Sequence, residues 1–217
     1  MQRGALFLAF AVILFMAAGS LDWVRAWVYV IYTVLMETCM LYLLVRKAPD
    51  MLNERGRLHA GVKTFDKVFA VAWLALALTT PVVAGFDAVR FGWSSMSMAA
   101  AYWGAILMAV GYALGTWAMV ANEHFEQFVR IQTERAHRVV TTGPYKVVRH
   151  PGYAGGIMGT LAAPLILGTW WTLVPAGAIV LLVIIRTELE DRTLREELEG
   201  YEAYAQRTNY RLFPCIW

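Results

Sequence analysis

Charged residues are scarce in this 217-residue chain. Lys, Arg, Asp and Glu make up 16% of it, whereas soluble domains carry about 25%. Apolar residues account for 59% of the chain, which excludes an ordinary soluble domain and predicts a membrane protein. The length fits one domain, and we find no internal repeat or low-complexity tract that indicates a second.

Cysteine is nearly absent, with Cys39 inside an apolar run and Cys215 too close to the end for a prenylation box. We therefore expect no disulfide and no metal site. The sequence also lacks a strand, glycine-rich turn and helix in succession, which excludes a Rossmann-type cofactor domain.

Long apolar runs dominate what is present. They cover residues 4–19, 26–45, 68–86, 98–121, 153–168 and 170–185. A hydrocarbon core of ~30 Å requires about 20 helical residues, so the last two runs are short for independent spans. We predict an all-α, polytopic integral membrane protein with about four full spans and a C-terminal transmembrane helical hairpin turning at residues 168–171. We interpret residues 1–19 as a span and not a signal peptide, because the run leads directly into another span.

The C-terminal segment from Thr187 to Tyr204 predicts a separate amphipathic helix on the cytoplasmic surface. It is rich in helix formers, and Gly200 weakens its end. Basic residues gather in 46–67, in 122–152 and after 186, while the opposite side has only Arg25 and Arg90 and most of the tryptophans. This asymmetry places the three basic segments in the cytoplasm. It also explains the net charge of +3, so we expect no nucleic-acid partner.

Two polar clusters bracket the predicted hairpin. The first is Thr142–Tyr153, with rings, prolines and glycines around His150, and the second begins at Arg186 and includes Glu190. Both arms deliver polar groups to one end, which predicts a site at the membrane surface. A guanidinium there could bind an anionic group, and a carboxylate could bind ribose hydroxyls. Alternatively, Arg186 is a membrane anchor paired with Glu190, four residues on along one helix face.

Other polar and small residues allow two interpretations. Glu37 lies within a span, where a charge costs at least ~2.5 kcal/mol, so it either lines a cavity or is a neutral hydrogen-bonded group. Asn122, Glu123, His124 and Glu126 either face a cavity or only end a helix. The pairs Gly111/Gly115, Gly152/Gly156 and Gly155/Gly159 predict close helix packing, and those after Pro151 could instead admit a ligand to the backbone.

The stretch Gly143-Pro-Tyr-Lys-Val-Val-Arg-His-Pro-Gly-Tyr153, followed by Glu190-Asp191-x-x-Leu194 and Gly200-Tyr-x-x-Tyr204, resembles the isoprenylcysteine carboxyl methyltransferase family over about residues 122–214. The resemblance implies S-adenosylmethionine bound by a membrane-embedded fold. It implies a cofactor pocket of His137, Arg138, Val139, Val140, Tyr145, His150, Pro151, Gly152, Tyr153 and Glu190. Arg186 falls where the family has its substrate-carboxylate arginine. The family's upstream glutamine matches either Arg130 or Gln132, and the role of Asp191 stays open.

The predicted function is therefore methyl transfer from S-adenosylmethionine to a lipophilic or membrane-bound acceptor, first of all an isoprenylcysteine-like carboxylate. A phospholipid amine or a small thiol is the alternative, and these acceptors would have to lose a proton. An NADPH-dependent membrane reductase and a lipid carrier are the competing classes. Residues 1–121 are predicted to be scaffold and 122–217 to bind cofactor and substrate, with membrane lipid around them and no metal or obligate protein partner.

Overall fold

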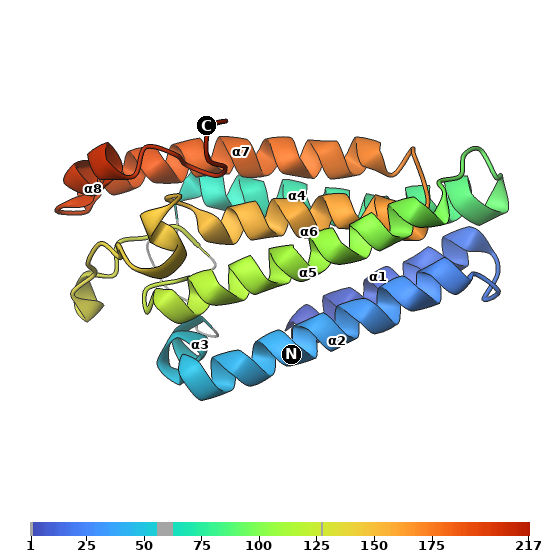
Figure 1. Ribbon diagram of the computed structural model, residues 1–217, viewed down its shortest axis with the longest axis horizontal. Helices are drawn as coiled ribbons and strands as arrows, with labels where there is room; N and C mark the ends of the chain where they lie inside the picture. The colour runs from blue at the N-terminus through green and yellow to red at the C-terminus, as the bar shows by residue number, and fades with distance from the viewer. Residues whose placement is uncertain (1, 56–62, 127) are drawn as a thin grey trace. The chain divides into compact units, whose positions relative to one another are not determined.

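The computed structural model describes residues 2–55, 63–126 and 128–217, and over these residues the chain is helical with no strand (Figure 1). The elements are α1 (Gln2–Ala18), α2 (Val24–Lys47), α3 (Pro49–Arg55), α4 (Thr64–Gly85), the π-helical η1 (Phe86–Arg90), α5 (Met98–Ala121), η2 (Thr133–Arg135), η3 (Gly143–Lys146), α6 (Pro151–Leu167), α7 (Leu173–Glu197) and α8 (Tyr201–Arg207). The predicted all-α class is confirmed for these residues. Part of the predicted basic loop 46–67 lies outside them.

Three apolar helices among the described residues are long enough to cross a membrane, whereas the sequence predicts about four full spans, because the first predicted span forms only a shorter helix. Among the described residues these are Val24–Lys47, Thr64–Arg90 and Met98–Ala121, and Gly4–Ala18 and Pro151–Leu167 are shorter apolar helices. Length and composition of these helices indicate an integral membrane protein.

The C-terminal helices differ from the prediction. The separate helix expected over 187–204 is wrong, because α7 continues without a break through Arg186 to Glu197. Residues 187–197 contain strong helix formers and no breaker, so the apolar helix simply extends into the polar segment. Gly200 then takes a left-handed conformation, with φ of 81°, and α8 begins after it. Arg186, Glu190 and Asp191 are consequently on one rigid helix.

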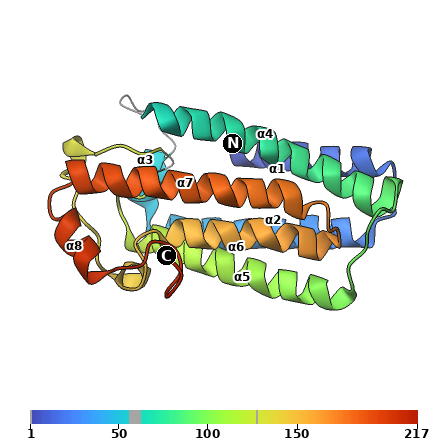
Figure 2. The same cartoon turned by 90° about the horizontal axis from the view of Figure 1, so that it is seen from above.

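The chain divides into two compact units. The first contains the described residues up to 37, 70–110 and 158–182, and its core includes Leu14, Trp23 and Leu167. Within it, α6 and α7 lie side by side and are joined by a short turn at Gly168, where φ is 83° (Figure 2). The predicted hairpin is thus confirmed. The guanidinium of Arg25 fills the space where a Cβ of residue 168 would lie.

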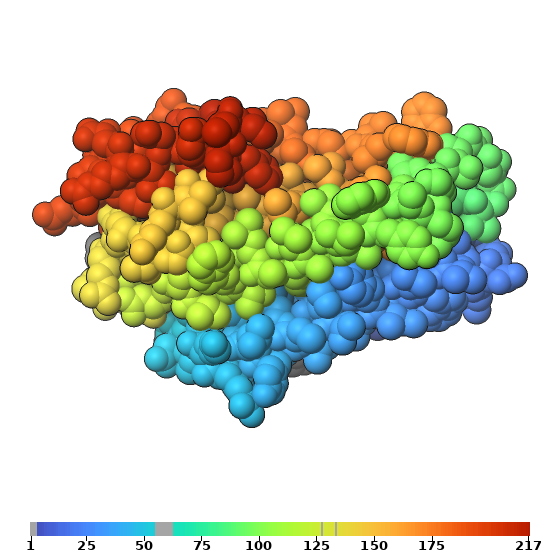
Figure 3. All heavy atoms as spheres, in the orientation of Figure 1, coloured from blue at the N-terminus to red at the C-terminus, as the bar shows by residue number. Residues whose placement is uncertain are grey.

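The second unit contains the described residues of 38–69, 111–157 and 183–217. Its yellow 122–150 segment and red C-terminal residues meet on the face shown in Figure 3. Within this unit α5 and α6 approach closely, because a Cβ at Gly155 would lie 2.5 Å from the Gly111 carbonyl oxygen. The predicted small-residue packing is confirmed at this contact. A Cβ at Gly156 or Gly159 meets nothing within 4 Å.

Candidate active site

A cavity of about 820 Å³, including its open mouth, lies in the second unit. It is bounded by the end of α5, the 122–150 segment, the first turn of α6 and the polar part of α7. Every predicted cofactor or acceptor residue lines it except Pro151, which begins α6 beside it. Asn122, His124 and Glu126 also line the cavity, which favours the cavity-facing interpretation of that segment.

Local backbone rules explain how the 142–153 segment reaches the cavity. Gly143, the first residue of η3, has φ of 59°, a left-handed conformation that glycine adopts at little cost, and Pro144 follows it. Pro151 occupies the first position of α6, where its missing N–H is not needed. Tyr145 is held at both ends, since its hydroxyl accepts a hydrogen bond from Asn122 (3.2 Å) and its carbonyl accepts one from Tyr204 (2.7 Å).

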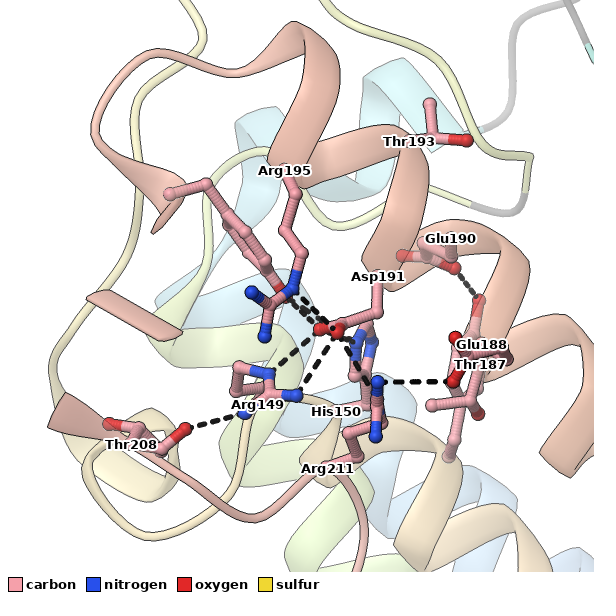
Figure 4. A network of polar contacts seen from close by, with 12 residues as sticks. Arg149, His150, Thr187, Glu188, Glu190, Asp191, Thr193, Arg195, Thr208 and Arg211 are labelled. Carbon is pink, nitrogen blue, oxygen red and sulfur yellow. Dashed lines mark hydrogen bonds and ion pairs between the residues drawn. The ribbon is translucent and has the colours of Figure 1, made fainter. Parts of the chain in front are cut away.

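Asp191 is the centre of a buried polar network (Figure 4). Arg149 donates to both of its oxygens, from Nε at 2.7 Å and Nη2 at 3.0 Å. Its other partners are Tyr201 at 2.9 Å, Arg211 at 3.1 Å, Arg195 at 3.2 Å and His150 at 3.3 Å. Burial by itself raises the pKa of Asp191, but its hydrogen bonds with His150 and Arg149 hold that pKa well below the usual range. The role left open by the sequence is therefore structural, because Asp191 fixes the Arg-His pair that enters α6.

Glu190, the neighbour of Asp191 in the chain, is not part of this network and lines the cavity instead. The Tyr153 hydroxyl donates a hydrogen bond to its carboxylate. The rings of His150 and Tyr153 are nearly parallel, with centroids 5.7 Å apart and an interplanar angle of 8°. These three residues form a carboxylate beside two stacked flat faces.

Arg186 is paired with a residue that the sequence did not single out, Asp66 of α4. Its Nε lies 2.7 Å from Asp66 Oδ1, and its Nη2 donates to Oδ2 at 3.1 Å. The guanidinium lies over the rings of Phe69 and Tyr153, with its carbon 4.5 and 5.2 Å from their centroids. The sequence does show an acid, Asp66, near the start of an apolar run. Its distance along the chain from Arg186 gives no reason to expect that the two residues pair.

Two histidines face each other at the cavity wall. The rings of His124 and His137 have centroids 4.5 Å apart. His124 is buried, and neither of its ring nitrogens has a hydrogen-bond partner among the described residues. Nearby, the buried Gln132 amide donates to the His124 carbonyl at 2.7 Å, while Arg130 is held by Glu126 at 2.7 Å. Both candidates for the family's glutamine therefore lie at the cavity.

The histidine pair predicts acid sensitivity. Burial, followed by the charges of His124, Arg130 and Arg135, lowers the pKa of His137 to about 4. An unfolded histidine has a pKa of about 6.5, so between these values the unfolded chain binds more protons. The stabilisation is complete above about pH 6.5 and is lost as the pH falls towards 4. We expect the unfolding midpoint in detergent to drop between pH 7 and 5, and His137→Gln to flatten this dependence. An equally steep dependence in the variant would contradict the assignment.

Comparison with known proteins shows similarity to methyltransferases over the part of the chain that contains the cavity. A family model described as phospholipid methyltransferase matches residues 99–199. A probable protein-S-isoprenylcysteine O-methyltransferase from Oryza sativa subsp. indica is 27% identical over 116 residues, which cover 50% of this chain and 58% of the rice protein. Protein-S-isoprenylcysteine O-methyltransferase B from Arabidopsis thaliana is 28% identical over 112 residues, 48% of this chain and 54% of that protein. The matched part thus spans little more than half the length of these relatives.

The chain thus combines a helical membrane fold with similarity, over about half of its length, to membrane-embedded methyltransferases. The family that they support is the isoprenylcysteine carboxyl methyltransferase family. The resemblance seen in the Arg-His-Pro motif is confirmed.

Proposed function

We propose that the chain transfers the methyl group of S-adenosylmethionine to a lipophilic acceptor in the membrane. The observation that carries this proposal is that one cavity is lined by Glu190, the stacked rings of His150 and Tyr153, and the buried imidazole of His124. The basic segments around the cavity favour a position on the cytoplasmic side, where a soluble cofactor would enter.

The side chains present fit this cofactor. Flat faces at His150 and Tyr153 suit an adenine ring, and the Glu190 carboxylate can accept hydrogen bonds from ribose hydroxyls. The rings also suit the positively charged sulfur, to which aromatic faces are attracted. When bound, the cofactor supplies a methyl group made reactive by that sulfur. The protein then has to align donor and acceptor and keep water out.

The names of the relatives favour an isoprenylcysteine carboxylate as acceptor, bound by Arg186. The geometry does not favour it, because the guanidinium already faces Asp66. We therefore propose a lipophilic acceptor without assigning it a carboxylate. A reductase is less consistent with the cavity, since the arginines suited to an extra phosphate are paired with acids: Arg130 with Glu126, Arg138 with Glu123 and Arg149 with Asp191.

Calorimetric titration of the detergent-solubilised protein with S-adenosylhomocysteine and, in parallel, NADPH tests this function. We expect S-adenosylhomocysteine to bind. His150→Ala and Tyr153→Ala should each weaken its binding by ~1–3 kcal/mol, because a buried hydrogen bond is no longer made. Tyr210→Ala is the matched control, since this half-exposed tyrosine is not part of the cavity wall. Unchanged affinity in both cavity variants would show that the cofactor does not bind in this cavity. Binding of NADPH alone would favour a reductase.

A further inference from the structure

We infer that a basic groove beside the cavity of Glu190 (the Glu190 cavity) binds the phosphate of an anionic membrane lipid. The groove lies in the second unit, between the 139–146 segment and the face of α8 that carries Arg207. Lys146 and Arg207 are its charged side chains, and no acid among the described residues lines it. Basic pockets on the cytoplasmic side of membrane proteins are suited to anionic headgroups.

The two cations of the basic groove have no acid partner, whereas the arginines around it do. Lys146 and Arg207 are exposed, and the side chain of neither has a hydrogen bond or an ion pair among the described residues. A carboxylate lies at 3.1 Å or less from each of Arg130, Arg138, Arg149, Arg186, Arg195 and Arg211. The charge at the groove is therefore available to an anion from outside, to which a guanidinium can donate two hydrogen bonds.

The acids nearest along the chain do not neutralise the groove. Tyr204 and Arg207 are three positions apart and share the groove face of α8. Glu202 is only two positions from Tyr204 and so faces another side of the helix, where its carboxylate lies 2.7 Å from Arg195. Glu199 precedes α8 and is not part of the groove.

Exposed apolar side chains beside the groove favour a lipid over a soluble phosphate. Val147 follows Lys146 and is 55% exposed, and Trp117 on α5 is exposed to the same extent. Trp117 lies against Gly143 at the start of η3, because a Cβ there would be 3.1 Å from its indole nitrogen. Tryptophan is enriched at the level of the bilayer headgroups. The segment that carries Lys146 thus offers both a charge and apolar contacts, as an amphiphile requires.

The basic groove shares a wall with the Glu190 cavity. Val139 and Tyr204 line both. The Tyr204 hydroxyl also donates a hydrogen bond of 2.7 Å to the carbonyl of Tyr145, a residue of the Glu190 cavity. A headgroup that fixes this wall should therefore raise the affinity for the cofactor, and the cofactor should raise the affinity for the lipid by the same factor. This coupling rests on the proposed function, whereas binding of the lipid does not.

Titration with short-chain lipids tests the site. The detergent-solubilised full chain is titrated with dihexanoyl phosphatidylglycerol and, in parallel, with dihexanoyl phosphatidylcholine, which has the same tails and phosphate but no net charge. We expect the anionic lipid to bind at least about tenfold more tightly. Soluble glycerol 1-phosphate has no tails to bury and should bind at least about tenfold more weakly than the anionic lipid.

Variants of exposed residues make this result specific. The double variant Lys146→Gln with Arg207→Gln removes both charges and buries nothing, so it should fold and lose the preference for the anionic lipid. Arg192→Gln is the matched control. Arg192 is also exposed and without an ion pair among the described residues, but it lines neither the groove nor the Glu190 cavity. This variant should keep the wild-type preference.

The affinity for S-adenosylhomocysteine measures the coupling. In nanodiscs that contain phosphatidylglycerol, the wild-type protein should bind it at least about fivefold more tightly than in nanodiscs of phosphatidylcholine alone. The double variant should show no difference between the two. The same wild-type affinity in both nanodiscs would contradict the coupling through the shared wall.

Three outcomes of the lipid titration would overturn the inference. They are equal binding of the two lipids by the wild-type protein, a preference that survives in the double variant, and binding of glycerol 1-phosphate as tight as that of the anionic lipid. The last would indicate a site for a soluble phosphate. Absence of S-adenosylhomocysteine binding in either nanodisc would instead contradict the proposed function, and the lipid titration would still decide the groove.

Discussion

Replacing Asp191 by alanine should destabilise the protein by about 3–5 kcal/mol, the cost of removing one partner from a buried ion pair. The effect is large because Arg149 is buried with it and would keep its charge without a carboxylate. The same change releases the Tyr201 hydroxyl and the His150 ring. We expect a lower unfolding midpoint in detergent and a poor yield of folded protein.

Two variants make this result specific. Arg149→Ala should cost a similar amount, and the double variant should cost much less than the sum, because both substitutions break one interaction. Glu188→Ala is the control: Glu188 is on the same helix and pairs with Arg211 at 3.1 Å, but it is 42% exposed, so its loss should cost no more than about 1 kcal/mol. A similar destabilisation by Glu188→Ala and Asp191→Ala would show that the network is not the cause.

Replacing Gly155 by alanine should also be strongly destabilising. The added methyl group would lie 2.5 Å from the Gly111 carbonyl oxygen and 2.9 Å from the Gly115 nitrogen, and both are backbone atoms that cannot rotate away. α5 and α6 would have to separate, and overpacking of this kind costs about 1–3 kcal/mol or more. Thermal unfolding of the purified protein measures the effect, and Gly155→Leu should prevent folding.

Gly156 provides a matched control on the same helix. A Cβ there meets nothing within 4 Å, so Gly156→Ala should be neutral or should stabilise the helix by up to about 1 kcal/mol. If both substitutions had the same effect, helix propensity would explain it and the close contact of α5 with α6 would not.

The sequence predicted the helices well where one local property decides them. Each apolar run corresponds to a helix, because the bilayer core requires every backbone group to be paired within its own segment. The extent of α7 was predicted poorly. The hydropathy of the sequence falls at Arg186, but its helix propensity stays high. The helix therefore continues to Glu197.

The site was predicted as a set of residues but not as a network. Rings, glycines and prolines close together in 142–153 identified one wall, since they are neighbours along the chain. For His124 the sequence left two interpretations open, a cavity-facing group or a helix terminus, because the lining of a cavity depends on the tertiary structure.

By itself, the sequence determined the membrane class, the position of the helices and the family resemblance, because composition, hydropathy and short motifs are local properties. Only the tertiary structure decided that Arg186 is paired with Asp66, 120 positions away, and that Asp191 gathers Arg149, Arg195 and Arg211. Ion pairs depend on which helices come together, and charge spacing along a chain does not record that.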